Sequence, residues 1–367
     1  MSVKCGDHGL RPVRLLILAL TIAAANLSDG RRLSAENFTH VVSFGDSLSD
    51  TGNLFDVTSN PVNQALLAIL FPELDPPIPS SPYFQGRFSN GPVWVDRLAN
   101  RLSLDPVTPS EHGGFNYAVG GATTFDDGNF LVNLILPDDV EDQVDDYLHA
   151  NTPSGSELFV VEGGANDLLS GGITDVGIPA SNIEGFITDL YIAGGRNFLV
   201  PNLPPLGQIP GEVGGADELA LDTRSLGFDA NLGARLDGLE QTFADIRIFR
   251  ADFHGVVLAV LDDPNAFGFT NVTGQAFDPN TNQVVPNPDE YLFWDDIHPT
   301  ARAHLLLGDL AADAILVPEP TGFFLSLVAF TGMLPLVSRS PRMRSSFRRR
   351  NKVDHFRTSR LGDRLDR

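Results

Sequence analysis

The sequence predicts an α/β fold, a sandwich with a parallel sheet at its centre, and two observations carry that prediction. Short, nearly continuous apolar runs are typical of strands buried on both faces of a sheet. They occur at 38–44, 158–161, 197–200 and 246–249. Helical patterns lie between and after them, at 92–102, 137–150, 183–193, 222–244 and 301–314. Because strand and helix alternate along the chain, we expect parallel strands joined by crossover helices.

The chain is also long enough for a large core, since its 367 residues are 42% hydrophobic and 20% charged. No clear linker interrupts residues 38–316, which favours a single domain, placed at 26–316. The Pro-rich residues 72–82 and the Asn/Pro-rich residues 264–288 are predicted to be surface loops that frame a cleft.

Charge is distributed unevenly along the chain. Residues 26–337 hold 43 of the 47 acidic residues but 11 of the 25 basic ones, a formal charge of −32. The lysines are Lys4 and Lys352, so arginine is the sole permanent cation of this stretch. Such a surface repels phosphate backbones, which argues against a nucleic-acid-binding domain. The surplus carboxylates suit a habitat rich in salt or divalent ions, or form an ordinary solvated face.

Residues 1–25 are predicted to be a signal peptide. Arg11 and Arg14 precede an apolar run, 15–25, that is too short to span a bilayer and ends in three alanines. Cleavage after Ala25 would export the protein to the cell surface or the medium. It would also remove the sole cysteine, Cys5, and leave neither a disulfide nor a thiol nucleophile.

Residues 317–367 are predicted to be a sorting signal. A VPEP motif at 317–320 precedes a second apolar stretch, 321–337, and a basic tail. An apolar stretch followed by basic residues is held in a membrane, with the basic residues on the cytoplasmic side. The arrangement resembles the PEP-CTERM signal of Gram-negative bacteria that export proteins to an exopolysaccharide-associated surface. The resemblance implies export machinery and a sorting protease as partners, with transient membrane anchoring. A plain C-terminal anchor, retained in the membrane, would give the same topology.

Ser47 is the candidate nucleophile. It lies in the segment 45–53, GDSLSDTGN, directly after the first predicted strand. This places its hydroxyl at the carboxyl end of the sheet, where open α/β folds build their sites. The segment lacks the G-x-S-x-G elbow of ordinary α/β-hydrolases. On its own the serine could equally be the N-cap of the next helix.

A serine hydroxyl needs a base to accept its proton and a third group to orient that base. Asp295 and His298 lie three residues apart, just before the helical pattern 301–314. In a turn there, the carboxylate can reach Nδ1 while Nε2 faces Ser47. Asp295 could instead cap the helix. The other histidines of residues 26–316 show no comparable arrangement: His40, which we place inside a strand, His112, His149, His254 and His304.

Two segments can supply hydrogen-bond donors for an oxyanion. Residues 116–122, NYAVGGA, contain a glycine turn whose N–H groups can approach a substrate. Residues 163–167, GGAND, follow a buried strand and carry an amide side chain. Either segment could also be an ordinary tight turn.

These four segments, in this order, resemble the GDSL or SGNH hydrolase family, which is named for serine, glycine, asparagine and histidine in four separated blocks. The match covers 38–314 in outline. Two further segments, 86–91 (GRFSNG) and 202–207 (NLPPLG), are similar to stretches of the subgroup with plant-type and bacterial lipase-like esterases.

The resemblance implies a flavodoxin-like, three-layer α/β/α sandwich and the hydrolysis of esters through an acyl-enzyme. Ser47 would then be the nucleophile, His298 the base and Asp295 its orienting group. The N–H groups of Ser47 and Gly121, with the side chain of Asn166, would form the oxyanion hole.

The resemblance implies neither a metal nor an organic cofactor, and the sequence shows no zinc-ligand spacing. The acidic residues 126–127 and the loop at Asp278 could bind calcium but are interpreted as solvated loops. Two ester substrates compete. The C-terminal signal favours acetyl groups on polysaccharide, and the lipase-like segments favour lipid or short-chain acyl esters. The alternative function is a non-catalytic surface or matrix protein that keeps the fold but has a blocked or disordered site.

Overall fold

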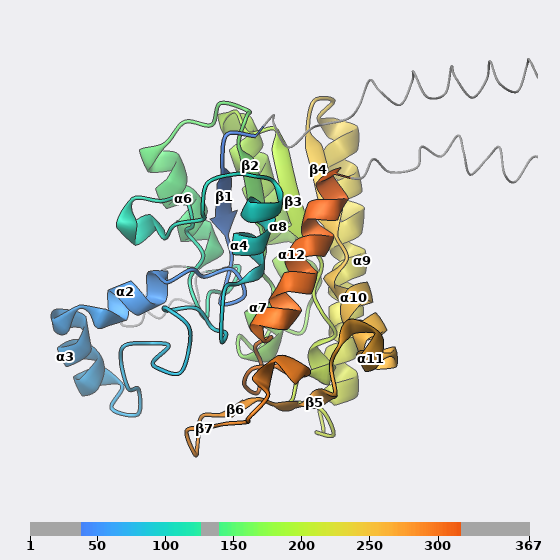
Figure 1. The fold of residues 1–367 in the computed structure, drawn as a ribbon. Helices are drawn as coiled ribbons and strands as arrows, with labels where there is room; N and C mark the ends of the chain where they lie inside the picture. The colour runs from blue at the N-terminus through green and yellow to red at the C-terminus, as the bar shows by residue number, and fades with distance from the viewer. Residues whose placement is uncertain (1–37, 126–138, 317–367) are drawn as a thin grey trace, which may run out of the picture. The chain divides into compact units, whose positions relative to one another are not determined.

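The computed structural model describes residues 38–125 and 139–316, which form a three-layer α/β/α sandwich (Figure 1). A sheet of four parallel strands, in the order β1-β2-β3-β4, makes the middle layer. The strands are β1 (Val41–Phe44), β2 (Leu158–Val161), β3 (Asn197–Pro201) and β4 (Arg247–Ala251). The predicted fold class is therefore confirmed. Strand boundaries differ from the predicted ones by one to three residues at β1, β3 and β4. Because β1 begins at Val41, His40 precedes the strand that we expected to contain it.

A segment outside the named strands extends the sheet beyond β1. The N–H of Ser43 donates to the carbonyl of Phe115 at 2.9 Å, and the N–H of Tyr117 donates to the carbonyl of Ser43 at 2.8 Å. The pairing is parallel. This segment follows β1 in the chain but lies outside it, so the sheet has the 2-1-3-4-5 order of flavodoxin-like folds. Ser47 follows β1, and it therefore lies at the point where such folds bind ligands.

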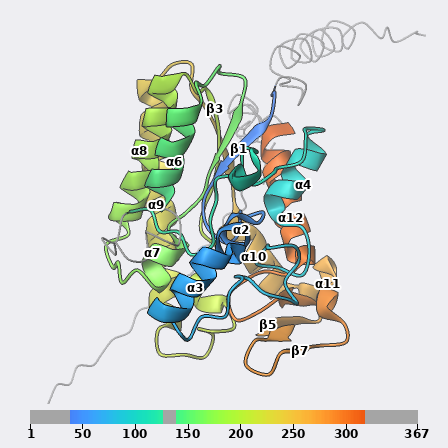
Figure 2. The same cartoon turned by 90° about the vertical axis from the view of Figure 1, so that its left-hand side faces the viewer.

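Alternate side chains of each strand reach the two outer layers. Val42 and Phe44 pack with α6, α7, α8 and α9, whereas Val41 packs with α4, α10 and α12. These two groups of helices cover opposite faces of the sheet (Figure 2). Both faces are buried, which is why the strands read as continuous apolar runs. The helices are α4 (Trp94–Arg101), α6 (Val140–Ala150), α7 (Ala165–Leu169), α8 (Gly177–Ala193), α9 (Glu218–Thr242), α10 (Phe253–Asp262) and α12 (Ala301–Leu316).

Several elements were not predicted. Helices α2 (Asn53–Ser59) and α3 (Pro61–Leu70) follow the Ser47 segment. The expected loop at 264–288 instead holds α11 (Pro264–Phe267) and three short strands, β5 (Asn271–Gln275), β6 (Phe277–Asp278) and β7 (Gln283–Val284). Strand β8 (Tyr291–Phe293) follows and pairs in parallel with β5. The expected loop at 72–82 contains turns and bends, as predicted.

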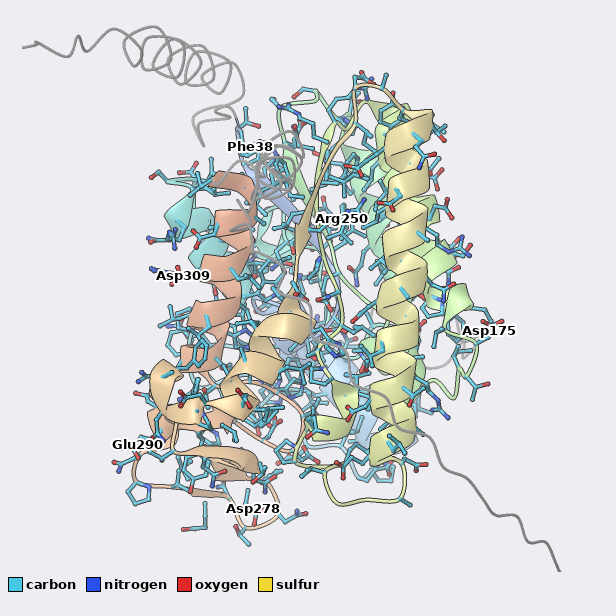
Figure 3. The ribbon with its side chains drawn as sticks, turned by 90° about the vertical axis from the view of Figure 1, so that its right-hand side faces the viewer. Phe38, Asp175, Arg250, Asp278, Glu290 and Asp309 are labelled. Atoms are coloured by element: carbon cyan, nitrogen blue, oxygen red, sulfur yellow. The ribbon has the colours of Figure 1, made fainter. Side chains whose placement is uncertain are left out.

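Arginines on the described surface pair with carboxylates. Arg97 and Arg101 both contact Asp309, at 2.8 and 2.6 Å, and Arg250 contacts two acidic residues of α9 at 2.7 Å (Figure 3). Partly exposed pairs of this kind contribute little to stability.

Within residues 38–125 and 139–316, no helix has both the length and the apolar character needed to cross a membrane. The predicted signal peptide, 1–25, and the predicted sorting signal, 317–367, lie outside the described residues, as does the acidic pair 126–127.

Candidate active site

Three side chains that the sequence singled out form one hydrogen-bonded chain. Ser47 lies in the loop after β1, and Asp295 and His298 lie in the turn between β8 and α12. The Nε2 atom of His298 is 2.9 Å from the Oγ atom of Ser47. Its Nδ1 atom is 2.8 Å from Oδ2 and 3.0 Å from Oδ1 of Asp295. Residues 251 positions apart in the chain are thus in hydrogen-bonding contact.

The Asp295 carboxylate shapes the turn that carries His298. Its Oδ1 atom accepts the N–H groups of Ile297 at 2.9 Å and of His298 at 2.6 Å. The first N–H of α12, at Ala301, is accepted by the side chain of Asn90 instead. Asp295 therefore orients the imidazole and does not cap the helix, which settles the alternative left open by the sequence.

Burial and charge set the protonation of this pair. Asp295 is 2% exposed, and burial alone would raise the pKa of its carboxyl group. The charge of His298 and hydrogen bonds from His298 and Tyr83 outweigh that effect and lower the pKa of Asp295 to about 2. Burial would lower the pKa of His298, but the facing Asp295 carboxylate raises it above its usual value. Asp295 is consequently a stable anion beside a base whose pKa it raises.

The Ser47 turn is fixed by buried polar groups. The side-chain amide of Gln143 pairs with both the N–H and the carbonyl of Gly45, each at 2.9 Å. The Oε2 atom of Glu162 accepts the N–H of Asp46 at 3.1 Å. A Cβ atom at Gly45 would lie 2.4 Å from that carboxylate oxygen, so glycine is required there. Ser47 is not a helix cap, because the N–H of Asn53, the first residue of α2, goes to Asp50.

The two oxyanion candidates lie beside each other. The Nδ2 group of Asn166, at the start of α7, donates to the carbonyl of Ala122 at 2.9 Å, and Ala122 directly follows Gly121. Gly121 has a φ of +89°, which favours glycine, and it is exposed. The neighbouring N–H of Gly120 donates to the Asp50 carboxylate and is therefore occupied. This leaves the N–H of Gly121 as the available donor of the pair.

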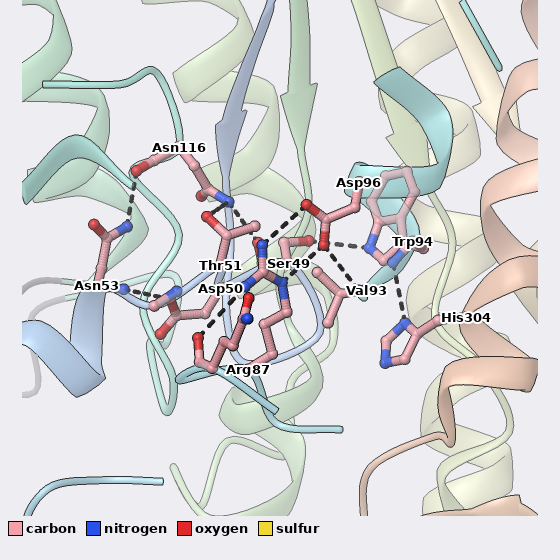
Figure 4. A network of polar contacts seen from close by, with 12 residues as sticks. Ser49, Asp50, Thr51, Asn53, Arg87, Val93, Trp94, Asp96, Asn116 and His304 are labelled. Carbon is pink, nitrogen blue, oxygen red and sulfur yellow. Dashed lines mark hydrogen bonds and ion pairs between the residues drawn. The ribbon is translucent and has the colours of Figure 1, made fainter. Parts of the chain in front are cut away.

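The GRFSNG segment reaches the same site. Phe88 lies against the imidazole of His298, with ring centroids 4.9 Å apart. Arg87 forms a two-point ion pair with Asp96 of α4, at 2.8 and 3.1 Å, and part of the neighbouring network is drawn in Figure 4. The family resemblance included this segment but gave it no role. In the structure, Arg87 binds α4 and Phe88 covers His298.

A second set of buried groups lies behind the nucleophile, and sequence reasoning missed it. The Oε2 atom of Glu162 accepts the N–H of Asp46 at 3.1 Å and the hydroxyl of Ser49 at 3.0 Å. The oxygen of Ser49 in turn accepts the indole N–H of Trp94 at 3.1 Å (Figure 4). Burial raises the pKa of both carboxyl groups, that of Asp46 to about 6. Glu162 directly follows β2 and belongs to none of the sequence motifs, so nothing in the sequence indicated its role.

His254 also faces a carboxylate, since its Nδ1 atom is 2.9 Å from Oδ2 of Asp229 and 3.1 Å from the carbonyl oxygen of Leu203. The partners are too far apart in the chain for spacing to reveal them. His304 is fully buried, which lowers its pKa to about 3, and its Nδ1 atom accepts the N–H of Trp94.

In the described part of the chain, no three His, Cys, Asp or Glu side chains gather as metal ligands would. Asp278 uses its carboxylate within its own turn, accepting from Asn280 and Thr281.

An apolar cavity lies beside Ser47. It contains about 850 Å³ of empty space when the solvent at its open mouth is counted. Apart from Asp46, Ser47 and Asn166, every lining residue is apolar. The NLPPLG segment and helices α10 and α12 supply much of this wall. Hydroxyl, amide and apolar surface thus meet in one cavity.

Comparison with known proteins identifies the family. The model for GDSL-like lipases and acylhydrolases matches residues 41–311, well over half of the chain. The chain belongs to this family. The predicted family and the predicted enzyme class, a carboxylic-ester hydrolase, are therefore confirmed.

This GDSL hydrolase is 26% identical over 350 residues to a GDSL esterase/lipase of Arabidopsis thaliana, covering 74% of this chain and 84% of that protein. It is 25% identical to a phosphatidylcholine-sterol acyltransferase of Aeromonas hydrophila, covering 82% and 94%. Among solved structures, it resembles a carbohydrate acetylesterase of Sinorhizobium meliloti, with a TM-score of 0.42, 18% identity and coverage of 76% and 98%.

Proposed function

We propose that this hydrolase cleaves carboxylic esters through an acyl-enzyme formed on Ser47. The hydrogen-bonded chain from Ser47 through His298 to Asp295 carries the proposal, because the base lies within 3.0 Å of both the nucleophile and the orienting anion. The Oγ atom of Ser47 attacks the ester carbonyl carbon while Nε2 of His298 takes its proton. The bond to the alcohol oxygen then breaks, and His298 gives that oxygen the proton.

Deacylation repeats the same steps with water. His298 takes a proton from water, the hydroxide attacks the acyl carbon, and the released Ser47 oxygen regains a proton from His298. In both steps the oxyanion is held by the N–H groups of Ser47 and Gly121 and by Asn166. The Asn166 amide has two N–H bonds and gives one to Ala122, so the other is available.

We further propose that the substrate acyl group is aliphatic and occupies the apolar cavity. An acyl chain that lies along the apolar walls would remove their surface from water, whereas an acetyl group would cover far less of that surface. The cavity therefore favours lipid or other acyl esters over acetylated polysaccharide. A panel of p-nitrophenyl esters of rising acyl length, assayed beside acetylated glycans, separates the two. Highest kcat/KM on acetyl substrates would contradict the lipid assignment.

Labelling with a fluorophosphonate tests the acyl-enzyme directly. Mass spectrometry of the treated protein should find one adduct, on Ser47. Ser47→Ala should lose turnover with little change in Tm, because a small loop side chain contributes little packing. An unlabelled Ser47, or equal loss of fold and activity, would favour the non-catalytic alternative.

Export is a separate proposal. Residues 1–25 would direct the chain out of the cytoplasm, and 317–367 would hold it in a membrane until a sorting protease acts. Both rest on the sequence patterns alone. Mass spectrometry of the mature protein from membrane and medium tests them, since intact termini at 1 and 367 would contradict both cleavages.

A further inference from the structure

Asp295 has a hydrogen-bond donor that no sequence motif reveals. The phenol O–H of Tyr83 donates to Oδ2 of Asp295 at 2.6 Å. The same oxygen lies 2.8 Å from Nδ1 of His298. The other oxygen, Oδ1, accepts two backbone N–H groups of the turn at 297–298. Tyr83 therefore holds the carboxylate from outside its own turn and shares one oxygen with the imidazole.

The ring of Tyr83 is fixed in place by other aromatic rings. It meets Phe277 at a centroid distance of 5.5 Å and an angle of 86°, and Trp294 at 6.1 Å and 82°. Edge-to-face pairs of this kind are favourable. Phe88, which covers His298, lies 6.1 Å from the same ring. Because Trp294 directly precedes Asp295, the ring packs against the segment to which its hydroxyl bonds.

The phenol remains a donor across the working range of an esterase. Burial, followed by the facing carboxylate of Asp295, raises the pKa of Tyr83 above its usual value. The hydroxyl therefore stays protonated wherever His298 titrates. The other charged or titratable groups that face His298 are Asp46, Asp296 and His304.

We propose that Tyr83 is a positioning residue of the active site, which holds the Asp295 carboxylate against His298 and limits how strongly that carboxylate attracts the imidazole. This inference rests on the proposed function of the Ser47, His298 and Asp295 chain. Without the hydroxyl, Oδ2 interacts with His298 alone, so the imidazole holds its proton more tightly. The carboxylate also loses one of its restraints, so the productive orientation is populated less.

The test is Tyr83→Phe in the full chain, which keeps the ring and its aromatic contacts. The acidic limb of kcat/KM against pH reports the protonation of His298 in the free enzyme. We expect that limb to move up by about half a pH unit or more, the scale on which one charge-assisted hydrogen bond shifts a pKa. We expect kcat to fall roughly 3- to 10-fold with KM unchanged, as for lost transition-state positioning.

Tyr191→Phe is the matched control. It removes another phenol-to-carboxylate hydrogen bond, between Tyr191 and Asp245, at an exposed site. Its pH profile and kcat should equal those of the wild type. In an Asp295→Asn background, Tyr83→Phe should add little further change, because residues that act through one group are not additive.

The outcomes separate this inference from the function on which it rests. If the fluorophosphonate labels Ser47 but Tyr83→Phe leaves the acidic limb and kcat unchanged, Tyr83 is not a positioning residue. An equal shift in the Asp295→Asn background would also overturn its action through Asp295. A wild-type protein with no Ser47 adduct would instead refute the acyl-enzyme itself.

Discussion

Phe88 lies against His298 because Gly120 has no side chain. A Cβ atom at Gly120 would lie 2.2 Å from the Phe88 ring, and the same ring lies tilted by 37° against the imidazole. The glycine pair 120–121 therefore has two roles. Gly120 leaves room for the ring that covers the base, and Gly121 offers its N–H to the site.

Gly120→Ala should lower activity by moving Phe88. Gly120 is not among the described residues with positive φ, so alanine meets no backbone strain there, and the clash with the ring is its main effect. We expect kcat to fall by about tenfold or more, since a small misplacement near the reacting groups is costly. Steady-state kinetics measures kcat, and circular dichroism checks that the variant keeps its fold. Gly233→Ala, on α9 with open space around its Cβ, is the control and should keep full activity. Equal kinetics for both variants would refute the role of Phe88.

Asp295→Asn should keep the fold and lose most turnover. The orienting anion disappears, so kcat should fall by about 10³- to 10⁴-fold, as in other serine triads. Without the carboxylate the pKa of His298 falls, so the acidic limb of the remaining activity should move to lower pH, opposite to Tyr83→Phe. An unmoved limb would contradict the orienting role.

The same variant gives a stability test with a defined sign. The pKa of Asp295 is lowered from 3.8 to about 2, so its carboxylate stabilises the fold above pH 4, and that contribution is lost as pH falls towards 2. The difference in Tm between wild type and Asp295→Asn should therefore be largest near neutral pH and shrink in acid. A difference that is constant with pH would contradict the lowered pKa.

The sequence was sufficient for much of the fold and for the contacts of Ser47, because the relevant signals are local. Buried parallel strands read as apolar runs, and Ser47 and Asn166 directly follow two of them. Asp295 and His298 lie within one turn. The segment at 115–117 that pairs with β1 was missed because residues 116–122 were interpreted as a glycine turn. Tyr83, Glu162 and the contact between His254 and Asp229 depend on tertiary packing between distant segments, which spacing does not encode.

Glu162→Gln should change how stability depends on pH. Burial raises the pKa of Asp46 from 3.8 to about 6 and that of Glu162 as well. A raised carboxyl pKa favours the folded state below pH 4, and that contribution is lost as pH rises through 6. Glutamine mimics the protonated acid and cannot ionise. The difference in Tm between the variant and wild type should therefore increase from pH 4 to pH 8. The increase should be a few degrees if the variant avoids about 1 kcal/mol of the cost of ionising the buried carboxyl groups.

Glu157→Gln is the control for that experiment. Glu157 is also buried, but hydrogen bonds from Ser154 outweigh its burial and lower its pKa. Its carboxylate therefore stabilises the fold above pH 4.5, and glutamine should be less stable than wild type by a constant amount from pH 5 to pH 8. If the Tm difference between Glu162→Gln and wild type is also constant from pH 5 to pH 8, the carboxyl groups of Asp46 and Glu162 do not titrate in this range.

Val260→Phe should shorten the acyl chain that the enzyme accepts. Val260 is 1% exposed on α10 and lines the apolar cavity beside Ser47, so a larger ring there removes volume that a long acyl group would fill. We expect kcat/KM for octanoyl esters to fall about tenfold or more relative to acetyl esters, since each buried CH₂ contributes roughly 0.8 kcal/mol. Leu258→Phe, on the outer face of the same helix, should leave the chain-length profile unchanged. If both variants keep the wild-type profile, the acyl group binds elsewhere, and the cavity does not determine the substrate.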